Sequence, residues 1–112
     1  MKKKVYICAP LGGDVAGNLE RVKRYTRYAL NCGMAPVVPQ FYALCLDDND
    51  PEQRQIGLDA GLSLLWFCDE LWLCGERVTP GMQAEIDFCR ILRIPIVKIP
   101  ETKLCETRRK PK

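Results

Sequence analysis

Glu85 is the residue of this sequence whose position is hardest to explain without a chemical role. A helix is predicted over residues 80–92, where apolar residues recur at helical spacing after a Thr-Pro start. Gln83 and Asp87 mark the polar face of that helix, and Glu85 lies about 200° around the axis from both. The Glu85 side chain therefore falls on the apolar stripe, in line with Cys89.

A carboxylate on an apolar stripe requires a hydrogen-bond or ionic partner, or a chemical function, because burial of an unpartnered charge costs much free energy. Glu85 lies in the second turn of the predicted helix, where the positive end of the helix dipole favours the ionised form. Two interpretations stay open. The carboxylate could be a catalytic group, or it could be a structural one bonded to loop amides or to an arginine.

Tyr6 is the second candidate, in a short strand predicted over residues 4–9. It lies toward the end of the strand that leads into Pro10-Leu-Gly-Gly-Asp14. Glycines in such a turn let backbone N–H groups approach an anion at the start of the next helix, which Asp14 is expected to cap. The turn matches neither the dinucleotide-binding nor the P-loop pattern. A tyrosine that only packs in the sheet is the alternative for Tyr6.

Composition narrows the possible chemistry, because the chain has no histidine. Ser-His-Asp and Cys-His nucleophile systems are excluded within one chain, and most zinc and iron sites are disfavoured. The seven cysteines are widely spaced without a C-x-x-C pair, which favours a reducing cytoplasm. Asp47-Asp-Asn-Asp50 lacks the glycine and distal glutamate of a calcium loop, so we interpret it as a helix cap. We expect no metal and no cofactor.

Predicted strands and helices alternate along the chain, and these elements must position the candidate residues. Strands are predicted over residues 4–9, 35–39, 70–74 and 95–99, and helices over residues 15–32, 51–67 and 80–92. The second helix is apolar nearly all round near its end, so we expect Trp66 and Phe67 to be buried there. Residues 40–49 are predicted to be a long loop.

This alternation predicts right-handed crossovers and a parallel sheet with helices on both faces. Open parallel sheets bind ligands beyond the carboxyl ends of their strands. The connections over residues 10–14, 40–50 and 75–80 all reach that edge, so we expect a site where they converge. Asp69 comes just before a strand, at the opposite edge, and we expect a structural role for it.

Length and charge predict one domain over residues 1–100, in a cytoplasmic protein without a membrane span. Residues 101–112 hold five basic and two acidic residues, an excess equal to the whole net charge of +3. The body is therefore neutral, and nucleic acid is not an expected partner of the fold. The tail is interpreted as a solvated, disordered end, with nucleic-acid contact through it as a weaker alternative.

Four segments resemble the nucleoside 2-deoxyribosyltransferase-like superfamily, including its nucleotide N-glycosidase branch. They are Val5-Tyr-Ile-Cys-Ala-Pro10 with Gly12-Gly13, Cys68-Asp-Glu-Leu-Trp-Leu-Cys-Gly75, Thr79-Pro-Gly-Met-Gln-Ala-Glu85 and Ile94-Pro-Ile-Val97. The likeness is greatest to short bacterial and phage members and spans residues 4–99. It implies a flavodoxin-like or Rossmann-like three-layer sandwich with a four- to five-stranded parallel sheet.

The resemblance also implies an activity, in which Glu85 matches the nucleophile that attacks the anomeric carbon of a (deoxy)nucleoside or its 5′-monophosphate. Tyr6 matches a tyrosine that orients this nucleophile or contacts the sugar. The residues implied at the substrate are Ala9, Pro10, Gly12, Gly13, Thr79, Gly81 and Met82. The expected partner is therefore a small nucleoside or nucleotide, in a homo-oligomer of a dimer or higher order.

One departure from the family pattern concerns the acid that protonates the leaving base. The characterised enzymes carry an aspartate where this chain has Gly61, and Asp59 is out of register with it. Another group could protonate the base, the ligand could differ, or catalysis could have been lost. A module of the same fold that binds a nucleotide ligand without turning it over is therefore the alternative function. The Rossmann-like phosphoribohydrolases rank lower, because their Pro-Gly-Gly-x-Gly-Thr pattern is absent.

Overall fold

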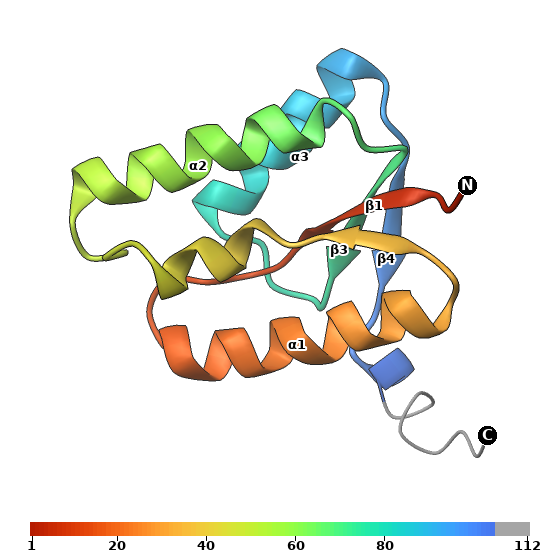
Figure 1. The fold of residues 1–112 in the computed structure, drawn as a ribbon, viewed down its shortest axis with the longest axis horizontal. Helices are drawn as coiled ribbons and strands as arrows, with labels where there is room; N and C mark the ends of the chain where they lie inside the picture. Colours follow the sequence, from red (N-terminus) through yellow and green to blue (C-terminus); the bar gives the residue numbers. More distant parts are fainter. Residues whose placement is uncertain (105–112) are drawn as a thin grey trace.

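The computed structural model describes residues 1–104, which form a four-stranded sheet between helical layers (Figure 1). The strands are β1 (Lys4–Cys8), β2 (Ala35–Val37), β3 (Glu70–Cys74) and β4 (Ile96–Ile99). The helices are α1 (Val15–Asn31), the 3-10 helix η1 (Pro39–Leu44), α2 (Pro51–Leu65) and α3 (Pro80–Leu92). Every strand pair is parallel, in the order β2-β1-β3-β4. The predicted α/β class is confirmed.

The two faces of the sheet carry separate apolar cores. Helix α1 covers one face, and α2 and α3 cover the other (Figure 1). Side chains of a strand alternate between faces, so Val5 and Ile7 of β1 pack toward α1, whereas Tyr6 and Cys8 pack toward α3. The first core includes Val22, Tyr25 and Ala29 of α1, and the second includes Met82, Ile86 and Cys89 of α3.

Side-chain caps begin the three α-helices at the residues that the sequence indicates. The carboxylate of Asp14 accepts the Gly17 N–H at 3.1 Å, and that of Asp50 accepts the Glu52 N–H at 3.0 Å. Thr79 Oγ1 accepts the Met82 N–H at 3.2 Å. Each cap satisfies an N–H group that the helix leaves unpaired, which fixes where each helix starts relative to the carboxyl edge of the sheet.

Residues 40–49 are less irregular than predicted, because η1 occupies residues 39–44. Pro39 starts this turn of helix, and Gln40 anchors it by donating from Nε2 to the Ile7 carbonyl at 2.8 Å. The anchor lies against the end of β1, a contact between distant segments that local turn patterns do not reveal.

The expectation that the end of α2 is buried holds for Leu65, which is fully buried, and is wrong for Trp66 and Phe67. Trp66 is 59% exposed and Phe67 is 69% exposed, and the helix itself ends at Leu65. Within α2, Gly61 and Leu65 are the buried residues, and the helix packs against η1 and α3. An apolar composition all round a helix therefore did not indicate burial all round it.

The folded body extends beyond Pro100. Residues 102–104 form one helical turn, and Leu104 is buried in the core on the α1 face. Leu104 therefore adds to the core of the body that the sequence predicts over residues 1–100. Residues 105–112, where the rest of the expected disordered tail falls, lie outside the described residues. In the described part of the chain, no helix is both long and apolar enough to cross a membrane.

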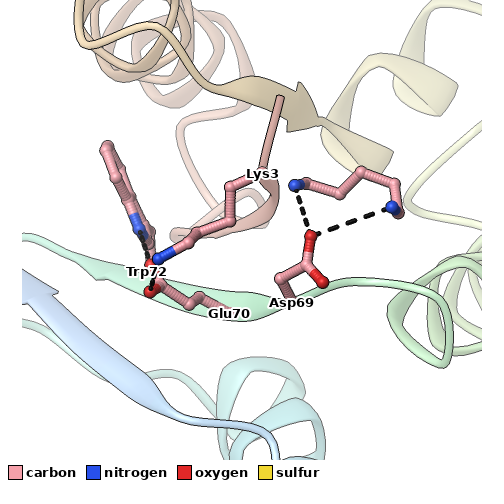
Figure 2. Close-up of polar contacts among 5 residues, drawn as sticks. Lys3, Asp69, Glu70 and Trp72 are labelled. Carbon is pink, nitrogen blue, oxygen red and sulfur yellow. Dashed lines mark hydrogen bonds and ion pairs between the residues drawn. The ribbon is translucent and has the colours of Figure 1, made fainter. Parts of the chain in front are cut away.

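Asp69 and Glu70 tie the amino ends of β1 and β3 together (Figure 2). Asp69 Oδ2 accepts the backbone N–H of Lys4 at 2.8 Å. Glu70 accepts from Lys3 Nζ at 2.9 Å and from Trp72 Nε1 at 3.0 Å, and these two bonds lower the pKa of Glu70. These carboxylates make structural contacts at this edge, as the sequence predicts for Asp69.

Candidate functional site

Glu85 is buried and holds its carboxylate between two hydrogen-bond donors from β1. Its side chain is 8% exposed. The Tyr6 hydroxyl donates to Oε2 at 2.7 Å, and the Cys8 thiol donates to Oε1 at 3.2 Å. Among residues 1–104, no lysine or arginine forms an ion pair with Glu85. Hydrogen bonding without a countercharge therefore accommodates this carboxylate.

The local sequence explains how the two donors meet the acid. Tyr6 and Cys8 are two residues apart on a strand, so their side chains share a face. Glu85 lies on the buried stripe of α3, which packs on that same face. The predicted position of Glu85 on this stripe is confirmed, and its partners are strand residues rather than the loop amides or arginine of the structural interpretation.

Burial dominates the electrostatics of the site. Removal of water from the carboxylate raises the pKa of Glu85 above its ordinary value, and the hydrogen bonds from Tyr6 and Cys8 partly offset this rise. Burial, together with the negative charge of Glu85, raises the pKa of the Tyr6 hydroxyl and of the Cys8 thiol far beyond the neutral range. Both groups therefore keep their protons at neutral pH and act as donors.

The Glu85 side chain forms part of the wall of a cavity of about 430 Å³ at the carboxyl edge of the sheet. This volume lies within the ~300–1,000 Å³ typical of small-molecule sites. The β1–α1 loop, η1 and the start of α3 contribute the wall, together with the first half of α2. The predicted convergence of connections at this edge is therefore observed, except that residues 75–77 face elsewhere.

Most of the residues that the resemblance implies at a substrate do line this cavity. They are Ala9, Gly12, Gly13, Thr79 and Gly81. Tyr6 is not among the residues that line the cavity; it is fully buried in the core, and its hydroxyl donates to the Glu85 carboxylate.

Two further expected residues lie away from the cavity. Pro10 faces a separate hollow of about 210 Å³ next to Tyr25 of α1, because the chain turns toward that side after Ala9. The Met82 side chain is buried under the first turn of α3, where its sulfur accepts the Thr79 N–H at 3.4 Å. Pro10 and Met82 therefore do not line the cavity that Glu85 lines, and their contact with a substrate stays a prediction.

Gln40 is a cavity residue that the sequence analysis did not single out. It is 5% exposed, and its Nε2 donates to the carbonyl oxygens of Ile7 and Ala9 at 2.8 and 3.3 Å. These bonds fix the amide, and its Oε1 is left without a partner in the described part of the chain. Because a buried unpaired acceptor is costly, this oxygen is suited to a donor on a ligand. The sequence feature that could have indicated Gln40 is its position directly after Pro39, at the start of a long connection.

Gly61 explains why the acid implied by the resemblance has no room here. A Cβ at this position would lie 2.7 Å from Tyr6 Oη and 3.2 Å from Pro39 Cβ. The bare Cα of Gly61 therefore lets the Tyr6 hydroxyl take its place beside Glu85. A side chain at position 61 requires Tyr6 or η1 to move.

Asp48 and Arg54 are the other charged residues of the cavity wall. Arg54 Nε donates to the backbone carbonyl of Asp48 at 3.3 Å. Asp48 Oδ2 is 3.4 Å from the point where a Cβ on Gly12 would lie, so this carboxylate reaches across to the β1–α1 loop. In residues 1–104, no cluster of three His, Cys, Asp or Glu side chains is suited to a metal ion.

A family model and solved structures match this chain. The family model described as Domain of unknown function (DUF7768) matches residues 3–99. A 2-deoxyribosyltransferase from Bacillus psychrosaccharolyticus has a similar fold, with a TM-score of 0.66 and 17% sequence identity over 85% of this chain and 70% of that one. A conserved protein from Enterococcus faecalis gives 0.58 and 18%, over 88% of this chain and 63% of that one. At these identities the likeness shows the fold. No curated protein matches the sequence.

Proposed function

The chain belongs to the family described as Domain of unknown function (DUF7768), and we propose that it cleaves the N-glycosidic bond of a (deoxy)nucleoside or nucleoside 5′-monophosphate. Glu85 is the nucleophile. The observation that carries this proposal is the buried Glu85 carboxylate, which is held by two neutral donors at the wall of a cavity. The likeness in fold to a 2-deoxyribosyltransferase supports it.

The reaction is a double displacement at the anomeric carbon of the sugar. An oxygen of Glu85 bonds to that carbon while the carbon–nitrogen bond breaks, and the electron pair of the broken bond stays on the base, which takes up a proton. Water then opens the glycosyl ester and gives free sugar, or a second base opens it and gives a new nucleoside. A positioned carboxylate thus divides one difficult step into two easier ones.

The environment of Glu85 suits this reaction. Burial without a countercharge leaves the ionised carboxylate poorly solvated, and so more reactive toward a carbon that develops positive charge. The Tyr6 hydroxyl orients the group without neutralising it. Asp48 is the second carboxylate of the cavity wall, and in this mechanism it gives a proton to the leaving base.

The experiment compares wild type with Glu85→Gln on a panel of 2′-deoxynucleosides and their 5′-monophosphates, with and without an added acceptor base. Chromatography measures the free base and any new nucleoside. We expect wild type to release base from some member of the panel and Glu85→Gln to be slower by about three orders of magnitude or more. Glu20→Gln, on the exposed side of α1, is the control and should keep the wild-type rate. No release by wild type from any panel member contradicts the proposal.

A second candidate function is a binding module that holds a nucleotide-derived ligand intact. The observation that favours it is Gly61, where the Tyr6 hydroxyl occupies the space that an acidic side chain would need. Calorimetry with the same panel, followed by recovery of the ligand, separates the two functions. Stoichiometric binding with the ligand recovered unchanged supports the binding module. Absence of binding to every nucleoside and nucleotide excludes it.

A further inference from the structure

Cys8 is buried beside the carboxylate, and its thiol donates a hydrogen bond to the second oxygen of that group. The residue is fully buried at the end of β1, and its Sγ lies 3.2 Å from Glu85 Oε1. Neither the sequence patterns nor the proposed mechanism needs a thiol at this position. An apolar residue of similar size would fill the same space in the core.

In the contact between Cys8 and Glu85, the proton is on the sulfur atom of Cys8. Burial is the main cause that raises the pKa of the Cys8 thiol, and the neighbouring Glu85 carboxylate raises it further. The thiol is therefore neutral at physiological pH and donates to the carboxylate. Because it is fully buried and protonated, Cys8 is not itself suited to be a nucleophile or a redox group.

The two oxygens of Glu85 are held unequally. Oε2 accepts a short O–H···O bond of 2.7 Å from Tyr6, a type of bond that is strong when the acceptor is charged. Oε1 accepts from a thiol, which is a weak donor. Oε1 therefore keeps more of the negative charge than Oε2, while its position is still fixed.

We propose that Cys8 is a positioning residue for Glu85: its thiol orients the carboxylate through Oε1. The effect on rate rests on the proposed function. The contact itself can be tested without any activity, through the titration of Glu85. The titratable groups around Glu85 are Tyr6 and Cys8 on β1 and Cys89 on α3, with Asp48 and Arg54 in the cavity wall.

The test replaces Cys8 by alanine and by valine, which cannot donate, and by serine, which can. Each variant is labelled with carbon-13 at the Glu carboxyl groups, and the Glu85 signal is assigned by its absence from Glu85→Gln. Loss of the donor removes a bond that favours the ionised carboxylate, so the pKa of Glu85 should rise in Cys8→Ala and Cys8→Val. It should not rise in Cys8→Ser.

Cys74→Ala is the matched control, because Cys74 is an equally buried thiol at the end of β3 that donates to the Trp72 carbonyl. It should leave the pKa of Glu85 unchanged, although it also removes a buried sulfur. An unchanged pKa in Cys8→Ala and Cys8→Val overturns the proposal. So does a serine variant that titrates like alanine.

Kinetics supply the second measurement. With a substrate from the panel, Cys8→Ala and Cys8→Val should lower kcat by about five- to tenfold, with KM within about twofold of wild type. The acidic limb of the pH–rate profile should move to higher pH, and Cys8→Ser should restore both. A shifted pKa with an unchanged kcat contradicts the positioning role. If wild type releases no base, the proposed function fails, and the titration alone decides whether Cys8 orients the carboxylate.

Discussion

The Tyr6 hydroxyl lies 2.7 Å from Glu85 Oε2, although 79 residues separate them in the sequence. Both groups are buried, and the tyrosine reaches the acid because Gly61 leaves open the space that a side chain would occupy. One hydrogen bond therefore connects strand β1, helix α3 and the glycine of α2 that leaves room for it.

Removal of the Tyr6 hydroxyl should destabilise the protein most where Glu85 is ionised. Tyr6→Phe deletes a hydrogen bond to a buried carboxylate, which costs about 1.5–3 kcal/mol when the acceptor is charged. Urea unfolding should show this loss at neutral pH and a smaller one in acid, where Glu85 is protonated. Tyr25→Phe, a buried tyrosine on the opposite face of the sheet, is the control. Equal losses of unfolding free energy for both variants at both pH values would show that the bond to Glu85 contributes no more to stability than the Tyr25 hydroxyl does.

Glu85→Gln should stabilise the fold at neutral pH. Burial raises the pKa of Glu85 in the folded state above its unfolded value near ~4.3, so the folded state binds the proton more tightly. The stability that comes from the protonated group is complete below the unfolded pKa and is lost as pH rises through the folded pKa. Thermal unfolding should therefore show a gain of about 0.5–2 kcal/mol for the variant at pH 7, which shrinks to nothing in acid. A gain that is independent of pH would count against this explanation.

Substitutions at Gly61 should disturb the Tyr6–Glu85 pair. Gly61→Ala puts a Cβ 2.7 Å from Tyr6 Oη, and we expect a loss of about 1–3 kcal/mol despite the better helix propensity of alanine. Gly57→Ala, one turn earlier on α2, meets only the flexible end of Leu46 and should be close to neutral. Chemical denaturation of both variants tests this difference. A Gly61→Ala protein as stable as Gly57→Ala would refute the contact.

Asp48 should affect turnover and leave the fold intact. Asp48→Asn removes the second carboxylate of the cavity wall, and the loss of a general acid typically lowers kcat by about 10²- to 10⁴-fold. The side chain is only partly buried, so the unfolding free energy should change by less than about 0.5 kcal/mol. Asp59→Asn, an exposed aspartate on α2 that is absent from the cavity wall, is the matched control. Wild-type base release by Asp48→Asn would remove Asp48 from the mechanism.

Local patterns were sufficient for the strands, for the three α-helices and for the burial of Glu85. The helical spacing of polar residues in α3 leaves no other place for its side chain, and the three caps follow from residue types at helix starts. The period of two along β1 also puts Tyr6 and Cys8 on one face. It does not tell which helix covers that face, because this depends on the order of strands in the sheet.

The contacts that could not be predicted from the sequence are those between residues far apart in the chain. Gln40 becomes a buried wall residue through carbonyl oxygens at the end of β1, and Gly61 matters through a hydroxyl that lies 55 residues earlier in the chain. Trp66 and Phe67 illustrate the opposite problem, since an apolar residue is buried only where another element covers it. Composition alone does not predict such coverage.

Mass spectrometry of the acid-quenched reaction tests the role of Glu85 most directly. Wild type is mixed with a panel substrate from which it releases base, quenched within one turnover, and digested. The account predicts a sugar covalently attached to the peptide that contains Glu85, and no such adduct in Glu85→Gln. Base release without an adduct on Glu85, at a rate that Glu85→Gln retains, would contradict it.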